Sequence, residues 1–421
     1  MKTVTKKAGR IKRLTELQTM TAEQMHFEEE MALIQGLIGL GMQAAAEKMQ
    51  REFKALVGQR YARGKPMGPW GTNEGSIYLG DQKVAIEVPR ARNAQTGEEG
   101  RLLSYERLQS PRLIEDLSLR RVINGISMKK YEDAALSIPE TFGISRDSVS
   151  RKWIRASRKK LAAMNERDLS SYDIVAIFLD GKHFSTDHEI VVALGITMDG
   201  EKVVLGMVET STENAIVCRD FMRSLVERGL RMDEPILCLI DGGKGIHKGV
   251  KTVLGNQAVI QRCQWHKREN VLGYLTKSEK DEYRRKLQSA YEKPTYEQAK
   301  KSLETIMREL RVLNISAANS LAEGFEETLT LHRLGLSQEL GRSFRTTNVI
   351  ENVNSLLGIY TDRVDYWKNS EQRQRWVATA LLHLEPTLRK VCGLEHLKQL
   401  RAAMVLLVGK RNQTQELIEA A

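Results

Sequence analysis

The sequence predicts an α/β fold for the middle of this 421-residue chain, and two stretches carry the prediction. Residues 236–240 are apolar and run into Asp241 and two glycines, and residues 174–179 run in the same way into Asp180 and Gly181. Apolar runs of this length, closed by Asp-Gly, are typical of buried strands that end in a sharp turn. Side chains at such strand ends face a crevice in α/β proteins, so Asp180 and Asp241 are the first candidate site residues. For either Asp-Gly pair alone, an ordinary turn is the alternative.

Length and composition set the broad class. The chain is long enough for two or three domains, and Lys and Arg exceed Asp and Glu by 65 to 54, which favours a polyanionic partner without requiring one. Four widely spaced cysteines and the lack of an apolar run after the basic N-terminus predict free thiols in a reducing cytoplasm rather than a secreted disulfide framework. The most apolar segment, residues 31–46, is interrupted by Gln35 and predicts a packed helix, so no membrane partner is expected.

The N-terminal third predicts three small regions. Residues 1–60 form a basic arm and a helical region: residues 1–13 hold six Lys/Arg and no acid, which suits either phosphate contact or a solubilising tail. Residues 61–115 contain a β-hairpin within 77–88, after Gly and Pro residues at 64–71 end the preceding helix. Arg90 and Arg92 follow the hairpin, where they either grip a phosphate backbone or belong to an exposed loop.

Residues 116–165 have the spacing of a helix-turn-helix. A short helical face over 131–136, a turn at 142–144 and a cap at Ser145 precede a helix with seven basic residues and one acid within 145–160. Such a helix suits a groove of DNA, and an ordinary helical pair with a solvated basic face is the alternative. The predicted DNA contacts on it are Arg146, Arg151, Lys152 and Arg155.

Residues 168–267 supply the first part of the core. Strands are predicted at 173–180, 190–196 and 202–208, a helix at 213–228 closed by Gly229, a strand at 235–240, a helix at 245–254 and a strand at 258–262. This order is that of a ribonuclease-H-like fold, in which the first and fourth strands are neighbours. Asp180 and Asp241 are therefore expected to lie together.

The rest of the chain is predicted to be helical. Residues 268–344 form an insertion, 345–385 the final helices of the core and 386–421 a helical tail. The helix that opens near residue 348 has apolar positions that suit docking on the sheet and carries Glu351. Asn348 as N-cap with Glu351 three residues on also fits a capping box, so spacing alone leaves a structural role for Glu351 open.

Asp180, Asp241 and Glu351, if they converge, need a counter-charge. Ionised carboxylates about 4 Å apart repel by roughly 4 kcal/mol per pair at an effective dielectric constant near 20. Hard oxygen ligands select Mg²⁺ or Mn²⁺, and two such ions activate a water or a 3′-hydroxyl and stabilise the leaving oxygen of a phosphodiester. No separate general base is then required.

Four motifs carry a resemblance to a known family: Leu-Asp-Gly at 179–181, Ile-Asp-Gly-Gly at 240–243, Cys-Gln-Trp-His-Lys at 263–267 and Thr-Asn-Val-Ile-Glu-Asn-Val-Asn at 347–354. Over roughly residues 170–385 the chain resembles the Mutator-like bacterial insertion-sequence transposases, which are DDE enzymes with a ribonuclease-H-like core and a helical insertion. The resemblance implies that Asp180, Asp241 and Glu351 are the metal-binding catalytic triad, with Cys263, His266 and Asn348 nearby. It also implies that His266 positions the scissile strand. Residues 182–184 differ from the residues that are usual at these positions in the family.

Two further interpretations concern metal and DNA. Cys263 and His266 lack a second pair of ligands at suitable spacing, so a structural zinc site is not predicted. Arg363 and Lys368, with Arg373, Arg375 and two tryptophans nearby, are predicted to contact DNA, although the tryptophans suit a core equally well.

The leading hypothesis is a bacterial DNA transposase that binds terminal inverted repeats through residues 1–160 and then cuts and joins double-stranded transposon-end and target DNA with two Mg²⁺ or Mn²⁺ ions. A homodimer or larger oligomer, associated with the nucleoid in the cytoplasm, is expected from the resemblance. One alternative is a ribonuclease-H-like nuclease that does not join strands. The other is a catalytically inactive DNA-binding regulator.

Overall fold

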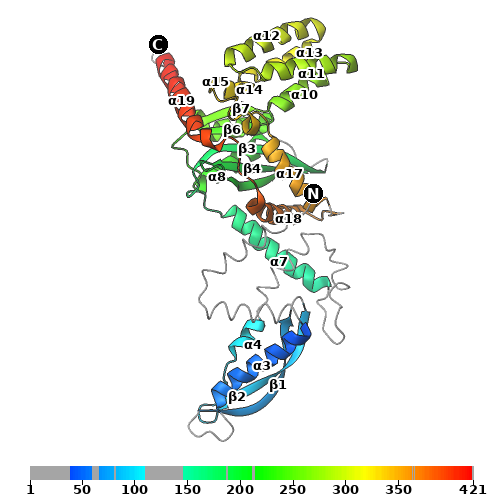
Figure 1. Ribbon diagram of the computed structural model, residues 1–421, viewed down its shortest axis with the longest axis vertical. Helices are drawn as coiled ribbons and strands as arrows, with labels where there is room; N and C mark the ends of the chain where they lie inside the picture. The colour runs from blue at the N-terminus through cyan, green and yellow to red at the C-terminus, as the bar shows by residue number, and fades with distance from the viewer. Residues whose placement is uncertain are drawn as a thin grey trace, which may run out of the picture. The chain divides into compact units, whose positions relative to one another are not determined.

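The computed structural model describes residues 38–58, 66–79, 82–109, 146–185, 188–210, 214–362, 364 and 366–419 (Figure 1). The chain divides into two compact units, residues 1–156 and 157–421. The predicted basic arm and the first helix and turn of the helix-turn-helix lie outside the described residues. No described helix is long and apolar enough to cross a membrane.

The first unit contains a helix packed on a β-hairpin. Helix α3 (Ile38–Val57) lies against strands β1 (Met67–Leu79) and β2 (Gln82–Asn93), with the short helix α4 (Leu103–Leu108) beside them. The strands are longer than predicted, because pairing continues from Leu79 and Gln82 out to Met67 and Asn93 across a register shift. A two-stranded sheet has only edge strands, and edge strands tolerate prolines. The prediction that Arg90 and Arg92 follow the hairpin is therefore wrong: both lie within β2.

The second unit is built on a five-stranded mixed sheet with strand order β5-β4-β3-β6-β7. Strands β3 (Ile174–Ser185), β4 (His188–Thr197) and β5 (Lys202–Thr210) are antiparallel, whereas β6 (Ile236–Ile240) and β7 (Ala258–Arg262) run parallel to β3. Helices α8 (Ala215–Glu227) and α9 (Lys244–Leu254) bury an apolar core on the sheet. The predicted α/β class and the pairing of the first strand with the fourth are confirmed.

Strand β3 does not end where the sequence predicts. Its parallel pairing with β6 stops at Leu179 opposite Ile240, but its antiparallel pairing with β4 continues from Asp180 to Ser185. The Asp-Gly pair at 180–181 is therefore part of a strand rather than a turn, because one neighbouring strand still offers backbone partners.

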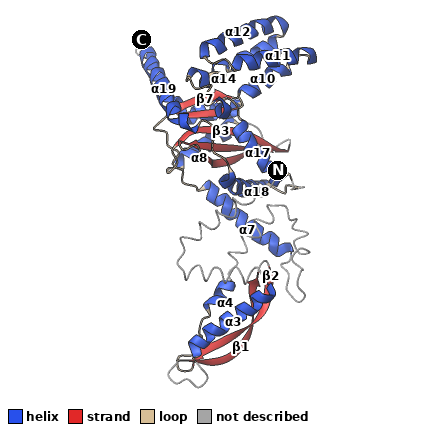
Figure 2. Ribbon diagram, in the orientation of Figure 1, coloured by secondary structure: helices blue, strands red, loops and turns tan. Residues whose placement is uncertain are grey.

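The described chain beyond β7 is helical. Figure 2 shows these helices in blue next to the red strands of the sheet. Helices α10 (Gln264–Gly273), α11 (Lys277–Tyr291), α12 (Tyr296–Leu313) and α13 (Ile315–Ala322) share a core of their own and gather beyond the β7 side of the sheet in Figure 1. Short helices α14 (Phe325–Thr328), α15 (Thr330–Arg333) and α16 (Gly341–Phe344) lead to α17 (Asn348–Thr361), α18 (Ser370–Leu384) and α19 (Leu397–Glu419). Helix α7 (Arg146–Asn165) crosses the division between the two units.

Candidate active site

Two aspartates meet at the edge of the sheet where β6 ends. Leu179 and Ile240 are partners in the parallel register of β3 and β6, so Asp180 and Asp241, the residues that follow them, are neighbours. The backbone N–H of Gly243 donates to Asp241 Oδ1 at 2.9 Å, within the turn that separates β6 from α9. One aspartate is thus held by a strand and the other by a turn.

Helix α17 brings Glu351 to the same edge. Its buried residues include Ile350, Val353 and Leu357, and the helix contacts β3. Just before it, Phe344 of α16 stacks on Phe178 of β3 with ring centroids 5.8 Å apart. Apolar burial therefore fixes the face of the helix that meets the sheet.

The capping box that spacing left open for Asn348 and Glu351 is not formed. The N-cap is Thr347, whose carbonyl accepts from the backbone N–H groups of Ile350 and Glu351 at 3.0 and 2.9 Å. Asn348 is the first residue of the helix, and its side chain is exposed. The carboxylate of Glu351 is therefore not used for capping and accepts a hydrogen bond from the Thr347 hydroxyl instead.

Asp180 is the most strongly perturbed of the three acids. Burial raises the pKa of its carboxyl group to about 6, and the negative charges of Asp241 and Glu351 act in the same direction. The side-chain amide of Asn354 opposes this shift by donating to Asp180 Oδ2 at 2.7 Å, and His266 opposes it by its charge. Asp180 therefore lies close enough to both other acids to be affected by their charges, although among the described residues these three carboxylates do not form a group with ligand atoms within 4.8 Å of one another.

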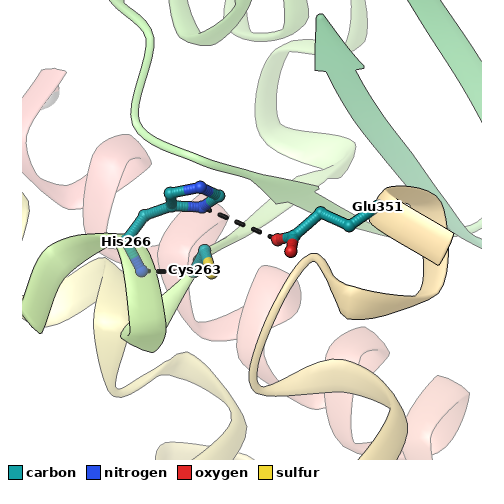
Figure 3. Close-up of side chains that lie close together, drawn as sticks. All are labelled: Cys263, His266 and Glu351. Atoms are coloured by element: carbon teal, nitrogen blue, oxygen red, sulfur yellow. Dashed lines mark hydrogen bonds and ion pairs between the residues drawn. The ribbon is translucent and has the colours of Figure 1, made fainter. Parts of the chain in front are cut away.

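Cys263, His266 and Glu351 form a tighter group beside the aspartates (Figure 3). Their potential ligand atoms lie within 4.8 Å of one another, and within the described part of the chain this is the one group of three that does so. His266 Nδ1 lies 3.9 Å from Glu351 Oε1 and 3.2 Å from the hydroxyl of Thr347. The Cys263 sulfur accepts from the backbone N–H groups of His266 and Thr347 at 3.5 and 3.4 Å.

The electrostatics of this group favour a protonated histidine. The pKa of His266 is raised to about 9, chiefly by its hydrogen bond with Cys263, and burial opposes this shift. The charges of Glu351 and Asp241 contribute in the same direction as Cys263. Burial opposes ionisation of the Cys263 thiol, but its hydrogen bonds to His266 and Thr347 leave its pKa below the usual value. At neutral pH His266 therefore carries a positive charge next to Glu351.

The donor set distinguishes two kinds of metal. Carboxylate oxygens such as those of Asp180, Asp241 and Glu351 are hard ligands, of the kind that suits Mg²⁺ or Mn²⁺. The cysteine and histidine beside them fit zinc less well, because structural zinc sites take four ligands and the described residues supply three there. The Cys263 sulfur is also buried among hydrogen-bond donors.

The side chains predicted to contact DNA lie in several places. Arg90 pairs with Glu99, and the guanidinium group of Arg92 donates to the Gly97 carbonyl and lies 4.9 Å from the centre of the Trp70 ring. Arg151 and Arg155 are exposed on α7, whereas the side chains of Arg146 and Lys152 lie outside the described part, as does Arg363.

The tryptophan-containing segment is more deeply packed than a DNA surface would be. Trp376 is buried, and its ring contacts Trp367 edge to face at 6.2 Å, which favours the core interpretation. Arg373 and Arg375 are buried as well, whereas Lys368 is exposed. Of the four basic residues predicted here, Lys368 is thus the one whose described side chain faces solvent.

Sequence reasoning missed Thr347 and Asn354. Both contact a predicted catalytic acid, Thr347 through Glu351 and Asn354 through Asp180. Their spacing was the available signal. Thr347 lies four residues before Glu351 and Asn354 three residues after it, so all three side chains share one face of the helix.

Comparisons with known proteins agree with these motifs. A sequence profile described as "Transposase, Mutator family" matches residues 13–387. A transposase for insertion sequence IS905 of Lactococcus lactis is 23% identical over 353 residues, covering 80% of this chain and 85% of that protein. A transposase for IS256 in Tn4001 of Staphylococcus aureus is 21% identical, covering 72% and 77%. The match to an IS6120 transposase of Mycolicibacterium smegmatis is 34% identical but covers 32% of this chain and 42% of that relative.

Proposed function

The chain belongs to the Mutator family of transposases, and from this premise we propose that it binds the ends of its insertion sequence and catalyses metal-dependent cleavage and transfer of DNA strands. One observation carries the proposal. The parallel register of β3 and β6 makes Asp180 and Asp241 neighbours, and the charges of Asp241 and Glu351 both raise the pKa of Asp180. Strand order β5-β4-β3-β6-β7 supports a ribonuclease-H-like core.

Asp180, Asp241 and Glu351 would hold two Mg²⁺ or Mn²⁺ ions. When bound, such ions supply Lewis-acid stabilisation of the attacking and leaving oxygens of a phosphodiester. The acids come from a strand, a turn and a helix that pack on one core, so the positions of their oxygens are set by the fold. Rigid positioning and charge neutralisation are the main demands of phosphoryl transfer on a protein.

His266 supplies the positive charge of the site. It lies in the first turn of α10, and its raised pKa keeps it protonated at neutral pH. A protonated imidazole there would attract a DNA phosphate and orient the scissile strand beside Glu351. Asn348 is exposed at the start of α17, three residues before Glu351.

DNA recognition is assigned to the N-terminal 160 residues and to Lys368. The exposed residues Arg151 and Arg155 of α7 support this assignment, because clustered guanidinium groups bind phosphates. Arg90 and Arg92, on the basic strand β2, are included among the proposed DNA contacts. Pairing of two transposon ends calls for a homodimer or larger assembly on double-stranded DNA in the bacterial nucleoid.

The decisive experiment uses the DNA that flanks the gene. Purified wild-type and Asp241→Ala proteins are incubated with labelled terminal DNA and a target plasmid in Mg²⁺ or Mn²⁺. We expect only the wild type to nick at the repeat boundary and to join that end to the plasmid.

The three hypotheses give different products. Cleavage by the wild type without joined product would favour a nuclease. Binding by both proteins without cleavage in either metal would refute the catalytic proposal and favour a regulator. Identical circular dichroism spectra for the two proteins would exclude misfolding of Asp241→Ala as the reason for its loss of cleavage.

A further inference from the structure

Three polar side chains follow one stripe of α17 and its N-cap: Thr347, Glu351 and Asn354. Their spacing of i, i+4 and i+7 places them on one face of the helix. Thr347 is fully buried, and Asn354 is 9% exposed. The stripe therefore runs through the interface between α17 and the rest of the second unit, where apolar side chains are the usual occupants.

Thr347 occupies an N-cap but does not use its side chain to cap the helix. An N-cap threonine ordinarily accepts a hydrogen bond from a backbone N–H in the first turn, and this one makes no such bond. Its hydroxyl donates to Glu351 Oε1 instead, and His266 Nδ1 lies 3.2 Å from the same hydroxyl. A hydroxyl has one proton to donate, and the Cys263 sulfur, 3.3 Å away, is a weaker acceptor for it than the carboxylate oxygen of Glu351. This chain of hydrogen bonds fixes one oxygen of Glu351.

Asn354 does the same for Asp180. Its Nδ2 donates to Asp180 Oδ2 at 2.7 Å and so connects α17 to β3. Its Oδ1 is buried and has no hydrogen-bond partner among the described residues. A half-satisfied buried amide is a poor choice for stability alone, because burying an unpaired polar atom opposes folding. The position of Asn354 is better explained by what it does for Asp180.

We propose that Thr347 and Asn354 are positioning residues, each of which holds one oxygen of a metal-binding carboxylate so that the other oxygen is presented to the cation. Glu351 then offers Oε2, and Asp180 offers Oδ1. The inference rests on the proposed function, since it assumes that these acids bind Mg²⁺ or Mn²⁺. Partners of this kind matter because a carboxylate free to rotate loses part of its affinity for a metal.

The variants are chosen to preserve shape. Thr347→Val keeps the branched side chain and removes the hydroxyl, whereas Thr347→Ser keeps the hydroxyl. Asn354→Leu keeps the approximate volume and removes the donor. Asn352→Leu is the matched control, because Asn352 is exposed and lies on the other side of α17.

Mn²⁺ binding to the full-length protein is measured without DNA, by electron paramagnetic resonance and by titration calorimetry. We expect Thr347→Val and Asn354→Leu to bind Mn²⁺ about 10- to 100-fold more weakly than the wild type. Thr347→Ser should restore affinity to near the wild-type value, and Asn352→Leu should leave it unchanged. The Mn²⁺ concentration for half-maximal cleavage of terminal DNA should rise by the same factor, with DNA affinity in EDTA unchanged.

Two results would overturn the inference. One is wild-type Mn²⁺ affinity in both Thr347→Val and Asn354→Leu. The other is a loss that Thr347→Ser does not reverse. If either apolar variant fails to fold, Thr347→Ala and Asn354→Ala replace it with the same criteria. If Asp241→Ala also binds Mn²⁺ like the wild type and the wild type does not cut DNA, the proposed function fails as well.

Discussion

Leu179 of β3 and Ile240 of β6 are direct partners in a parallel register. The residues that follow them, Asp180 and Asp241, consequently meet at one edge of the sheet, and burial together with the charge of Asp241 raises the pKa of Asp180 to about 6. Folding therefore brings like charges together before any cation is present.

Replacing Asp180 by asparagine should stabilise the metal-free protein. In the native state Asp180 has a raised pKa, so its ionisation opposes folding at every pH above the ordinary value of 3.8, most fully above about 6. We expect Asp180→Asn to increase the free energy of unfolding by about 1–3 kcal/mol at pH 8 in EDTA. The gain should shrink as the pH falls from 6 towards 4, where the wild-type carboxyl group is protonated.

Urea unfolding at pH 4, 6 and 8 measures this effect. Adding Mg²⁺ should reverse the order of stability at pH 8, because a cation that binds the native wild type stabilises it by mass action. A gain for Asp180→Asn that does not vary with pH would rule out charge repulsion as its cause.

Replacing His266 by glutamine should destabilise the protein in the opposite pH range. The native pKa of His266 is raised from 6.5 to about 9, chiefly by Cys263, so its charge contributes stability that is fully present below pH 6.5 and lost as the pH rises through 9. We expect a deficit of about 1–3 kcal/mol for His266→Gln at pH 6 that approaches zero at pH 10. Urea unfolding in EDTA at the two pH values gives the measurement, and an equal deficit at both would contradict the assignment.

Local sequence patterns predicted the elements that hydrophobic periodicity defines. The strand predicted at residues 258–262 is β7, and the helix predicted at 245–254 is α9 with one extra residue. Residues 258–260 are apolar and residues 245–254 have one apolar face, so the prediction depends on nothing distant in the sequence. The pairing of β3 with β6 followed because element order restricts the possible sheet topologies.

Other features depend on partners that local patterns do not contain. Strand β3 continues past Asp180 because β4 supplies hydrogen bonds, although Asp-Gly normally signals a turn. Thr347 rather than Asn348 is the N-cap, and both residue types are good caps, so composition did not distinguish them. The bond from Asn354 to Asp180 joins residues 174 positions apart, and no short-range signal predicts it.

The buried pair of Arg373 and Glu209 should be essential for stability. Both side chains are less than 10% exposed, their charged atoms lie 2.6 Å apart, and Gln374 also donates to Glu209. Arg373→Met leaves the buried Glu209 carboxylate without its guanidinium partner and with the half-exposed His188 3.5 Å away, which we expect to cost about 3–5 kcal/mol of unfolding free energy. Lys368→Met, at an exposed position nearby, should change stability by less than about 0.5 kcal/mol.

Thermal unfolding compares the two variants, and the double variant Arg373→Met with Glu209→Gln separates the causes. It should recover most of the loss, since no unpaired charge remains buried. A loss in the double variant as large as in Arg373→Met alone would mean that packing, rather than the unpaired carboxylate, causes the effect.

Helix α7 should contribute to DNA affinity through phosphate contacts. Arg151 is exposed on this helix, and a side chain that neutralises one phosphate contributes about 0.9 to the slope of log affinity against log salt. We expect Arg151→Gln to weaken binding of both terminal and unrelated DNA by similar factors and to lower that slope by about 0.9. Lys301→Gln, an exposed charge change on α12, is the matched control and should leave the slope unchanged. Fluorescence anisotropy at several salt concentrations gives the slopes. A loss confined to terminal DNA would instead make Arg151 a base-reading residue, because phosphate contacts do not distinguish sequences.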